Sequence, residues 1–133
     1  MSIHQNISFC SYNTLVLKYP YDGKDDYTRK AKNGVLFGED LHSRYGNRIA
    51  NKISHFNCDC VALQEVNKAC FDVLAEKLWQ KGYTGLFSNR NNGEDEGLAI
   101  FFKTHRFNVI SNHTHYFNDG SGRGILDVGL EVA

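Results

Sequence analysis

The feature of the sequence that most constrains its fold is a short apolar run, CVAL at residues 60–63, between two segments with helical periodicity. In the first segment, residues 43–56, apolar residues recur at three- and four-residue steps, which predicts one buried helix face. The second segment continues to Leu78, with Asn67 as its predicted N-cap and Gly82 as its predicted stop signal. A short apolar run between two such helices is typical of a buried strand in an α/β protein.

Predicted strands account for most of the remaining chain. The first covers residues 7–12 and ends at Asn13, and the second covers residues 61–64. Further strands are predicted after the second helix, over residues 83–87, 97–102, 107–116 and 125–132. Turns rich in glycine and asparagine separate these strands, and residues 21–27 are predicted to form a polar loop. The order βαβα followed by strands alone predicts an α/β fold whose late strands run antiparallel.

Composition gives no support for nucleic-acid binding through bulk charge or for a membrane location. The 133 residues are enough for one domain, and 15 Lys and Arg balance 15 Asp and Glu. Bulk charge therefore gives no argument for binding nucleic acid or a membrane. No apolar segment is long enough to cross a bilayer, and residues 1–6 lack a signal-peptide pattern. The 4 cysteines are accordingly predicted to be reduced thiols, which favours a cytoplasmic protein.

Two polar residues stand at the ends of the first two predicted strands. If a helix connects these strands in parallel, Asn13 and Glu65 lie at the same edge of the sheet, where α/β proteins place their ligands. Carboxylate and amide oxygens suit Mg²⁺ or Mn²⁺ better than zinc. The pair therefore indicates metal-assisted chemistry on a phosphate. The alternative is that Glu65 leaves its strand into solvent and Asn13 begins a turn.

Several segments carry a resemblance to a known superfamily. DCVALQEV, residues 59–66, resembles the D-x-x-x-L-Q-E-V signature of the endonuclease/exonuclease/phosphatase superfamily, and SFCSYNTL, residues 8–15, is similar to its first strand. GYTGLFSNR and NNGEDEGLAIFFKTHRF, together residues 82–107, resemble segments of its nocturnin, angel and carbon-catabolite-repression deadenylase branch. GRGILDVGLEV, residues 122–132, is similar to the strand that follows. The resemblance implies the α/β sandwich of this superfamily.

The resemblance also implies roles for single residues. By position, Glu65 is the expected acidic ligand of Mg²⁺, with Mn²⁺ as a possible substitute, and Asn13 is expected to orient the phosphate and the waters of the metal. Arg90 falls where deadenylase-like members place a basic residue near the substrate phosphate, and its planar donor fork suits that task. The alternative for Arg90 is an exposed loop charge. Arg48 falls near a W-x-x-R segment of relatives, but a solvated or sheet-packing helix arginine is the preferred interpretation.

Motifs that the superfamily uses later in its sequence have no match here. The chain contains no G-D-x-N and no Ser-Asp-His, and it reaches Ala133 while its pattern is still that of a strand. We therefore expect residues 1–133 to be the N-terminal half of a single domain, with one mixed sheet, two helices and the second half missing.

The implied function is a metal-dependent phosphodiester hydrolase. The preferred interpretation is a deadenylase-like exonuclease that acts on the 3′ ends of poly(A)-like RNA and is inactive as this truncated chain. One alternative is a phosphatase or sphingomyelinase-type hydrolase of the same fold, acting on a phosphorylated small molecule or a lipid headgroup. The other is a non-catalytic fragment or degenerate copy.

Two further patterns resemble binding sites. His113 and His115 share one strand face, a spacing that can bind metal. The histidine of the superfamily should follow the strand at residues 125–132, however, so both are predicted to be surface histidines. Cys58 and Cys60 lack a second ligand pair at zinc spacing and are interpreted as unrelated thiols, with Cys60 buried. The aromatic residues at 101, 102 and 107 are interpreted as core rather than as a stacking surface for bases.

Overall fold

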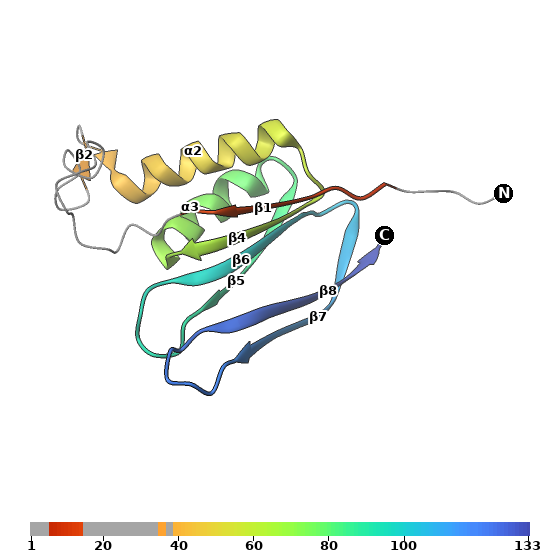
Figure 1. Cartoon of the computed structure of the whole chain (residues 1–133). Coiled ribbons are helices and arrows are strands. Elements are labelled where there is room, and N and C mark those ends of the chain that lie inside the picture. Colours follow the sequence, from red (N-terminus) through yellow and green to blue (C-terminus); the bar gives the residue numbers. More distant parts are fainter. Residues whose placement is uncertain (1–5, 15–34, 37–38) are drawn as a thin grey trace.

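The computed structural model describes residues 6–14, 35–36 and 39–133 (Figure 1). The predicted loop at residues 21–27 lies outside them. Along the described chain the elements are β1 (Phe9–Asn13), β2 (Val35–Leu36), β3 (Glu39–Asp40), α2 (Leu41–Phe56), β4 (Cys60–Val66), α3 (Lys68–Trp79), β5 (Tyr83–Asn89), β6 (Gly97–Lys103), β7 (Phe107–Tyr116) and β8 (Gly124–Val132). Within these ranges no helix is long and apolar enough to cross a membrane.

Four strands form a mixed sheet in the order β1-β4-β6-β5. Strand β1 runs parallel to β4, while β6 runs antiparallel to both β4 and β5. This arrangement confirms the predicted mixed sheet, the parallel pairing of the first two strands and the antiparallel late strands. Strands β7 and β8 pair with each other as a separate antiparallel hairpin, and β2 and β3 form a second small pair.

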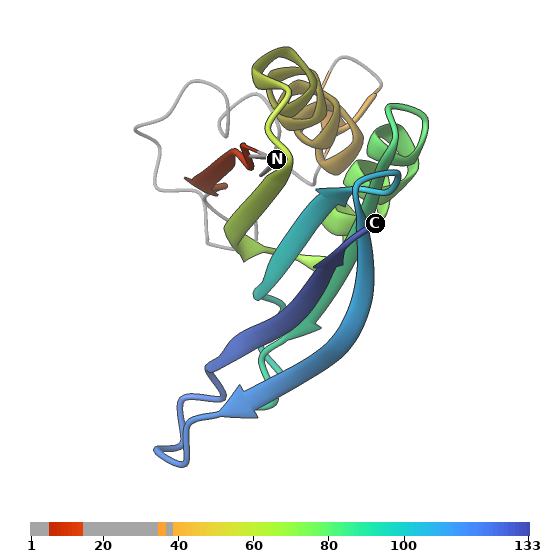
Figure 2. The same ribbon diagram turned by 90° about the vertical axis from the view of Figure 1, so that its right-hand side faces the viewer.

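The sheet is the middle of three layers. Figures 1 and 2 show α2 and α3 on one face of the sheet and the β7–β8 hairpin on the other. The main core lies between the helices and the sheet, where Leu63, Leu74 and Phe101 are at most 1% exposed. On the opposite face, Phe102 packs with Phe107 of the hairpin. The three aromatic residues at 101, 102 and 107 are thus core, as predicted.

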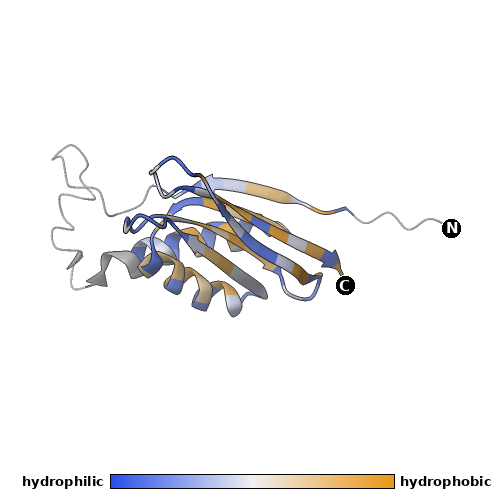
Figure 3. Cartoon of the chain, turned by 90° about the horizontal axis from the view of Figure 1, so that it is seen from below, coloured by the Kyte–Doolittle hydropathy of each residue, from blue (hydrophilic) through white to orange (hydrophobic). Residues whose placement is uncertain are grey.

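Local signals explain the helices. Asn67 is the N-cap of α3, because its side-chain oxygen accepts a hydrogen bond from the Cys70 amide at 2.9 Å. Gly82, the predicted stop, has a φ of +88° just after α3 ends at Trp79. Hydrophobic and hydrophilic residues alternate along both helices in Figure 3, as expected for helices with one buried face.

Candidate metal and phosphate site

Glu65 lies in a β-bulge near the end of β4. Leu63 pairs with Ala99 of β6 and Val66 pairs with Gly97, so Gln64 and Glu65 together oppose the single residue Leu98. Glu65 has a φ of +55°, which is unfavourable for a residue with a side chain. Such conformations cost of order 1–3 kcal/mol and persist where surrounding contacts hold them. The predicted strand ended at Gln64; the observed strand continues to Val66 because the bulge restores pairing.

Thr14 holds the bulge in place. Its amide and its hydroxyl both donate to the Gln64 carbonyl, at 2.9 and 3.1 Å, and the hydroxyl also lies 2.7 Å from the Glu65 carbonyl. The Tyr45 hydroxyl donates in turn to the Thr14 carbonyl. Thr14 is 1% exposed, so these bonds are shielded from water. The end of β1 is thereby fixed to the strained end of β4.

Asn13 lies beside this bulge. It is the last residue of β1 and is paired in register with Gln64. Asn13 and Glu65 both line a pocket of about 250 Å³. The parallel topology therefore brings together the two residues that were expected to meet at this edge.

Arg90 lines the same pocket and is not an exposed loop charge. Its Nη1 atom lies 3.1 Å from Oε2 of Glu96, and the two side chains are only 15% and 10% exposed. The Arg90 Nε atom is buried and has no hydrogen-bond partner in the part of the chain that the structure describes. A buried donor without a partner costs about 1–3 kcal/mol, so it is a feature that a bound acceptor would relieve.

The described residues fit part of a magnesium site. No hydrogen bond or ion pair joins the Glu65 carboxylate to another described residue, so its oxygens are available to a cation. No group of three His, Cys, Asp or Glu side chains suited to a metal occurs within the described ranges. Mg²⁺ typically binds one or two carboxylates and keeps water or phosphate oxygens at its remaining positions. Glu65, with Asn13 beside it, would supply one carboxylate, the smaller number of protein ligands that Mg²⁺ typically uses.

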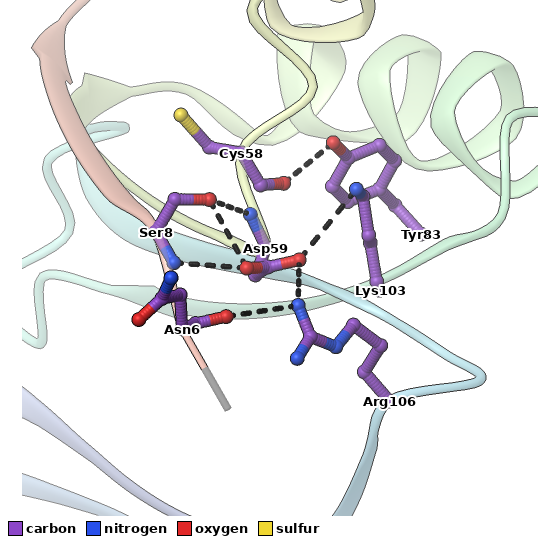
Figure 4. A network of polar contacts seen from close by, with 7 residues as sticks. All are labelled: Asn6, Ser8, Cys58, Asp59, Tyr83, Lys103 and Arg106. Atoms are coloured by element: carbon purple, nitrogen blue, oxygen red, sulfur yellow. Dashed lines mark hydrogen bonds and ion pairs between the residues drawn. The ribbon is translucent and has the colours of Figure 1, made fainter. Parts of the chain in front are cut away.

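Asp59, the first residue of the signature segment, has a different role (Figure 4). Its Oδ2 atom accepts hydrogen bonds from the Ser8 amide at 2.8 Å and the Ser8 hydroxyl at 3.1 Å. Its Oδ1 atom lies 2.8 Å from Nη1 of Arg106 and 3.5 Å from Nζ of Lys103. The Ser8 amide and the Arg106 guanidinium lower the pKa of Asp59 from 3.8 to about 2. Asp59 therefore joins the start of β4 to the residue before β1.

The sequence did not reveal this role of Asp59. Ser8 is 51 positions away in the chain, and nothing in the local pattern connects the two residues. The available signal was an aspartate directly before an apolar run, since a charge that is carried into a core needs partners.

The remaining candidates are surface or structural residues. His113 and His115 are exposed on β7, as predicted, and His115 Nε2 lies 3.1 Å from Oδ2 of Asp127. All 4 cysteines are free, and Cys60 is buried as expected. Arg48 is an exposed residue of α2, in agreement with the preferred interpretation.

Comparison with known proteins identifies the family. Residues 10–132 match the sequence profile of the Endonuclease/Exonuclease/phosphatase family. The match covers nearly the whole chain, so the protein belongs to this family. The family assignment and the α/β sandwich that the sequence resemblance implied are both confirmed.

The relatives include proteins of the branch expected from the sequence. CCR4-NOT transcription complex subunit 6-like-A of Xenopus laevis is 31% identical over 105 residues, which are 71% of this chain and 19% of the relative. 2′,5′-Phosphodiesterase 12 of Mus musculus is 34% identical over 74 residues, 55% of this chain and 12% of the relative. The chain thus spans less than a fifth of the length of either relative.

Solved structures show the same fold. ANGEL2, described as a 2′,3′-cyclic phosphatase and solved with adenosine-2′,3′-vanadate, superposes with a TM-score of 0.72 and 22% identity, over 96% of this chain and 37% of ANGEL2. TDP2 of D. rerio, solved with a single-strand DNA product, gives a TM-score of 0.62 and 18% identity, over 96% of this chain and 41% of TDP2.

Proposed function

We propose that this chain supplies the Glu65 end of the active site of a metal-dependent phosphodiester hydrolase, a deadenylase-like exonuclease that acts on RNA 3′ ends. The observation that carries the proposal is the Glu65 carboxylate: it has no described partner, its backbone is strained, and it shares a pocket with Asn13 and Arg90. The relatives support a nucleic-acid substrate, since one is a subunit of the CCR4-NOT transcription complex and another is a 2′,5′-phosphodiesterase.

The proposed roles follow from the donor chemistry. Glu65 would hold Mg²⁺, or Mn²⁺, through its carboxylate, and Asn13 would orient the phosphate through its amide. When bound, the metal supplies Lewis-acid polarisation of a phosphoryl oxygen and a bound water of lowered pKa. Arg90 would donate to phosphate oxygens, using the Nε atom that lacks a partner and leaving Nη1 on Glu96.

We further propose that residues 1–133 are the N-terminal part of one larger catalytic domain. The relatives support this, because nearly the whole chain matches the family profile while covering only 37% of ANGEL2. Such a part alone should have no hydrolase activity. The 4 free thiols support a reducing compartment, and the cytoplasm is the one we propose.

A substrate panel tests the activity. Poly(A) RNA, structured DNA, sphingomyelin and inositol phosphates would be given to the 133-residue chain and to a longer protein that contains it. We expect no turnover by the chain alone, and Mg²⁺-dependent shortening of poly(A) from its 3′ end by the longer protein. Glu65→Ala should abolish that turnover without unfolding, while Asp127→Ala, which removes an exposed carboxylate of β8 outside the pocket, should not.

The other outcomes are equally informative. Faster turnover of sphingomyelin or inositol phosphates than of RNA would assign the site to a phospholipid hydrolase or phosphatase. Mg²⁺-dependent cleavage by the chain alone would contradict the proposal that it is incomplete. Unchanged turnover by Glu65→Ala would remove that residue from the site.

A further inference from the structure

The pocket has a second wall that the metal site does not use. Opposite the end of β4, it is lined by residues from the tip of the β7–β8 hairpin, among them Tyr116, Phe117 and Arg123. We call these three residues, Tyr116, Phe117 and Arg123, the hairpin wall. Figure 2 shows this tip beside the connection between β5 and β6, which carries Arg90. One pocket therefore combines a carboxylate end with an aromatic and cationic wall.

Hydrogen bonds fix the hairpin wall to the rest of the site. The Tyr116 hydroxyl donates to the Asn89 carbonyl at 2.9 Å, next to Arg90. The Asn91 amide donates to the Gly122 carbonyl at 3.0 Å, and the Asn92 side chain donates to the Ser121 carbonyl at 2.8 Å. These contacts join the β7–β8 turn to the β5–β6 connection.

Gly122 shows how close the two turns lie. It has a φ of +71°, and a Cβ atom at this position would lie 2.6 Å from side-chain atoms of Asn92 and 2.7 Å from its amide nitrogen. Only glycine combines a positive φ at no steric cost with the absence of a Cβ atom, which would clash with Asn92. The hairpin wall is therefore preorganised by a tight backbone approach and not by side chains alone.

Phe117 directly follows β7, and about half of its surface is exposed. It is 49% exposed, whereas Phe101, Phe102 and Phe107 are 0%, 3% and 5% exposed. An exposed ring at the rim of a polar pocket buries no core surface, but it offers a face on which a planar group can stack. Phe117 and Arg123 are tied by backbone pairing, since the Phe117 amide donates to the Arg123 carbonyl at 2.8 Å.

We propose that the hairpin wall is a nucleobase subsite. Phe117 stacks on a base next to the phosphate at Glu65, and Arg123 contacts the sugar-phosphate backbone of the bound nucleic acid. This inference rests on the proposed function for the position of the phosphate. Aromatic faces combined with cations are the usual means of holding single-stranded nucleic acid without reading its sequence. The pocket has a volume of about 250 Å³, just below the roughly 300–1,000 Å³ typical of sites for drug-sized ligands, so it has room for a single base or phosphate group and not for a longer segment of nucleic acid.

Binding of two probes tests the subsite. A fluorescein-labelled oligoriboadenylate and an abasic ribose-phosphate chain of equal length would be titrated with the 133-residue chain in Mg²⁺, followed by anisotropy. The wild type should prefer the oligoriboadenylate. Phe117→Ala should lower the affinity for the oligoriboadenylate by about 5- to 150-fold, the range of base stacking, and leave the affinity for the abasic chain unchanged. Arg123→Ala should lower the affinity for both probes and reduce by about 0.7 the slope of log affinity against log salt concentration.

A matched control separates stacking from general hydrophobicity. Phe56 on α2 is 68% exposed and does not line the pocket, so Phe56→Ala should bind both probes as the wild type does. Phe117→Leu keeps an apolar side chain without a ring and should lose most of the preference for bases.

The outcomes distinguish the subsite from the proposed function. If the wild type binds both probes equally, or neither, or if Phe117→Ala keeps the preference for bases, the subsite is overturned. If Phe117→Ala loses the preference while Glu65→Gln leaves the Mg²⁺-dependent part of binding unchanged, the subsite stands and the metal assignment falls.

Discussion

Two carboxylates at opposite ends of β4, Asp59 just before it and Glu65 in its bulge, have opposite surroundings. Asp59, directly before β4, accepts two hydrogen bonds from Ser8 and lies near two cations. Glu65, near the end of β4, has a strained backbone and no described partner for its carboxylate. Since both belong to one signature segment, a motif can combine a carboxylate that holds the fold together with one that makes no bond to another described residue.

The largest expected effect concerns metal binding at Glu65. Glu65→Gln should lower the affinity for Mn²⁺ by more than about 100-fold, because loss of even an outer partner of a ligand typically costs about 10- to 100-fold. Paramagnetic relaxation of water protons would measure the bound Mn²⁺. Asp59→Asn is the matched comparison and should bind Mn²⁺ as the wild type does. Equal binding by Glu65→Gln and the wild type would remove the contrast between the two carboxylates.

The next effect concerns stability at Asp59. Asp59→Asn should lower the free energy of unfolding by about 3 kcal/mol, because it leaves Arg106 without its closest carboxylate. Urea titration at neutral pH would measure the change. Asp127→Asn removes an exposed carboxylate, 58% accessible, and should change stability by less than about 0.5 kcal/mol. A comparable loss in both variants would show that burial of Asp59 is not the cause.

The pH dependence of stability tests the contribution of the Asp59 carboxylate separately. The pKa of Asp59 is lowered from 3.8 to about 2, so the folded state favours its charged form. The resulting stabilisation, about 2 kcal/mol, is fully present above the unfolded pKa and is lost as pH falls toward 2. The stability difference between the wild type and Asp59→Asn should shrink across this range. A difference that stays constant from neutral pH to about pH 2 would contradict the shift.

The smallest effect is a gain in stability. Glu65→Gly should raise the free energy of unfolding by about 1 kcal/mol, because glycine accepts a φ of +55° without strain, while metal binding is lost. Asn57 has the same φ, and Asn57→Gly is the control. Asparagine tolerates this conformation well, so the control should gain less. Equal gains would indicate that the backbone at Glu65 is not specially strained.

Local patterns predicted most of the architecture. Strand β7 occupies the predicted residues 107–116. Helix α2 begins two positions before the predicted start at Ser43, and the recurrence of its apolar residues at three- and four-residue steps made it recognisable. The N-cap at Asn67 was also visible in the sequence, since capping depends on residues three positions apart. The meeting of Asn13 and Glu65 followed from the rules of parallel pairing, which apply to topology and not to single contacts.

Features that depend on distant contacts were not predictable. The conformation of Glu65 depends on Thr14, which is 51 positions away, and no side-chain pattern encodes that bond. Arg90 pairs with Glu96 across a turn, and residues of the β7–β8 hairpin line the same pocket. Phe117 follows the predicted strand at residues 107–116, and only the assembled pocket shows that it lines the same space as Glu65.

The bonds from Thr14 also bear on how the protein folds during synthesis. They join residues 50 and 51 positions apart, and among the described strands β1 lies at the edge of its sheet and pairs with β4 alone. Closing such a long segment costs entropy that later contacts must offset. A growing chain therefore cannot assemble this site until β4 has left the ribosome, and we expect β1 to dock after β5 and β6 have paired. Pulse-labelled hydrogen exchange would contradict this order if the Thr14 amide became protected before those of β6.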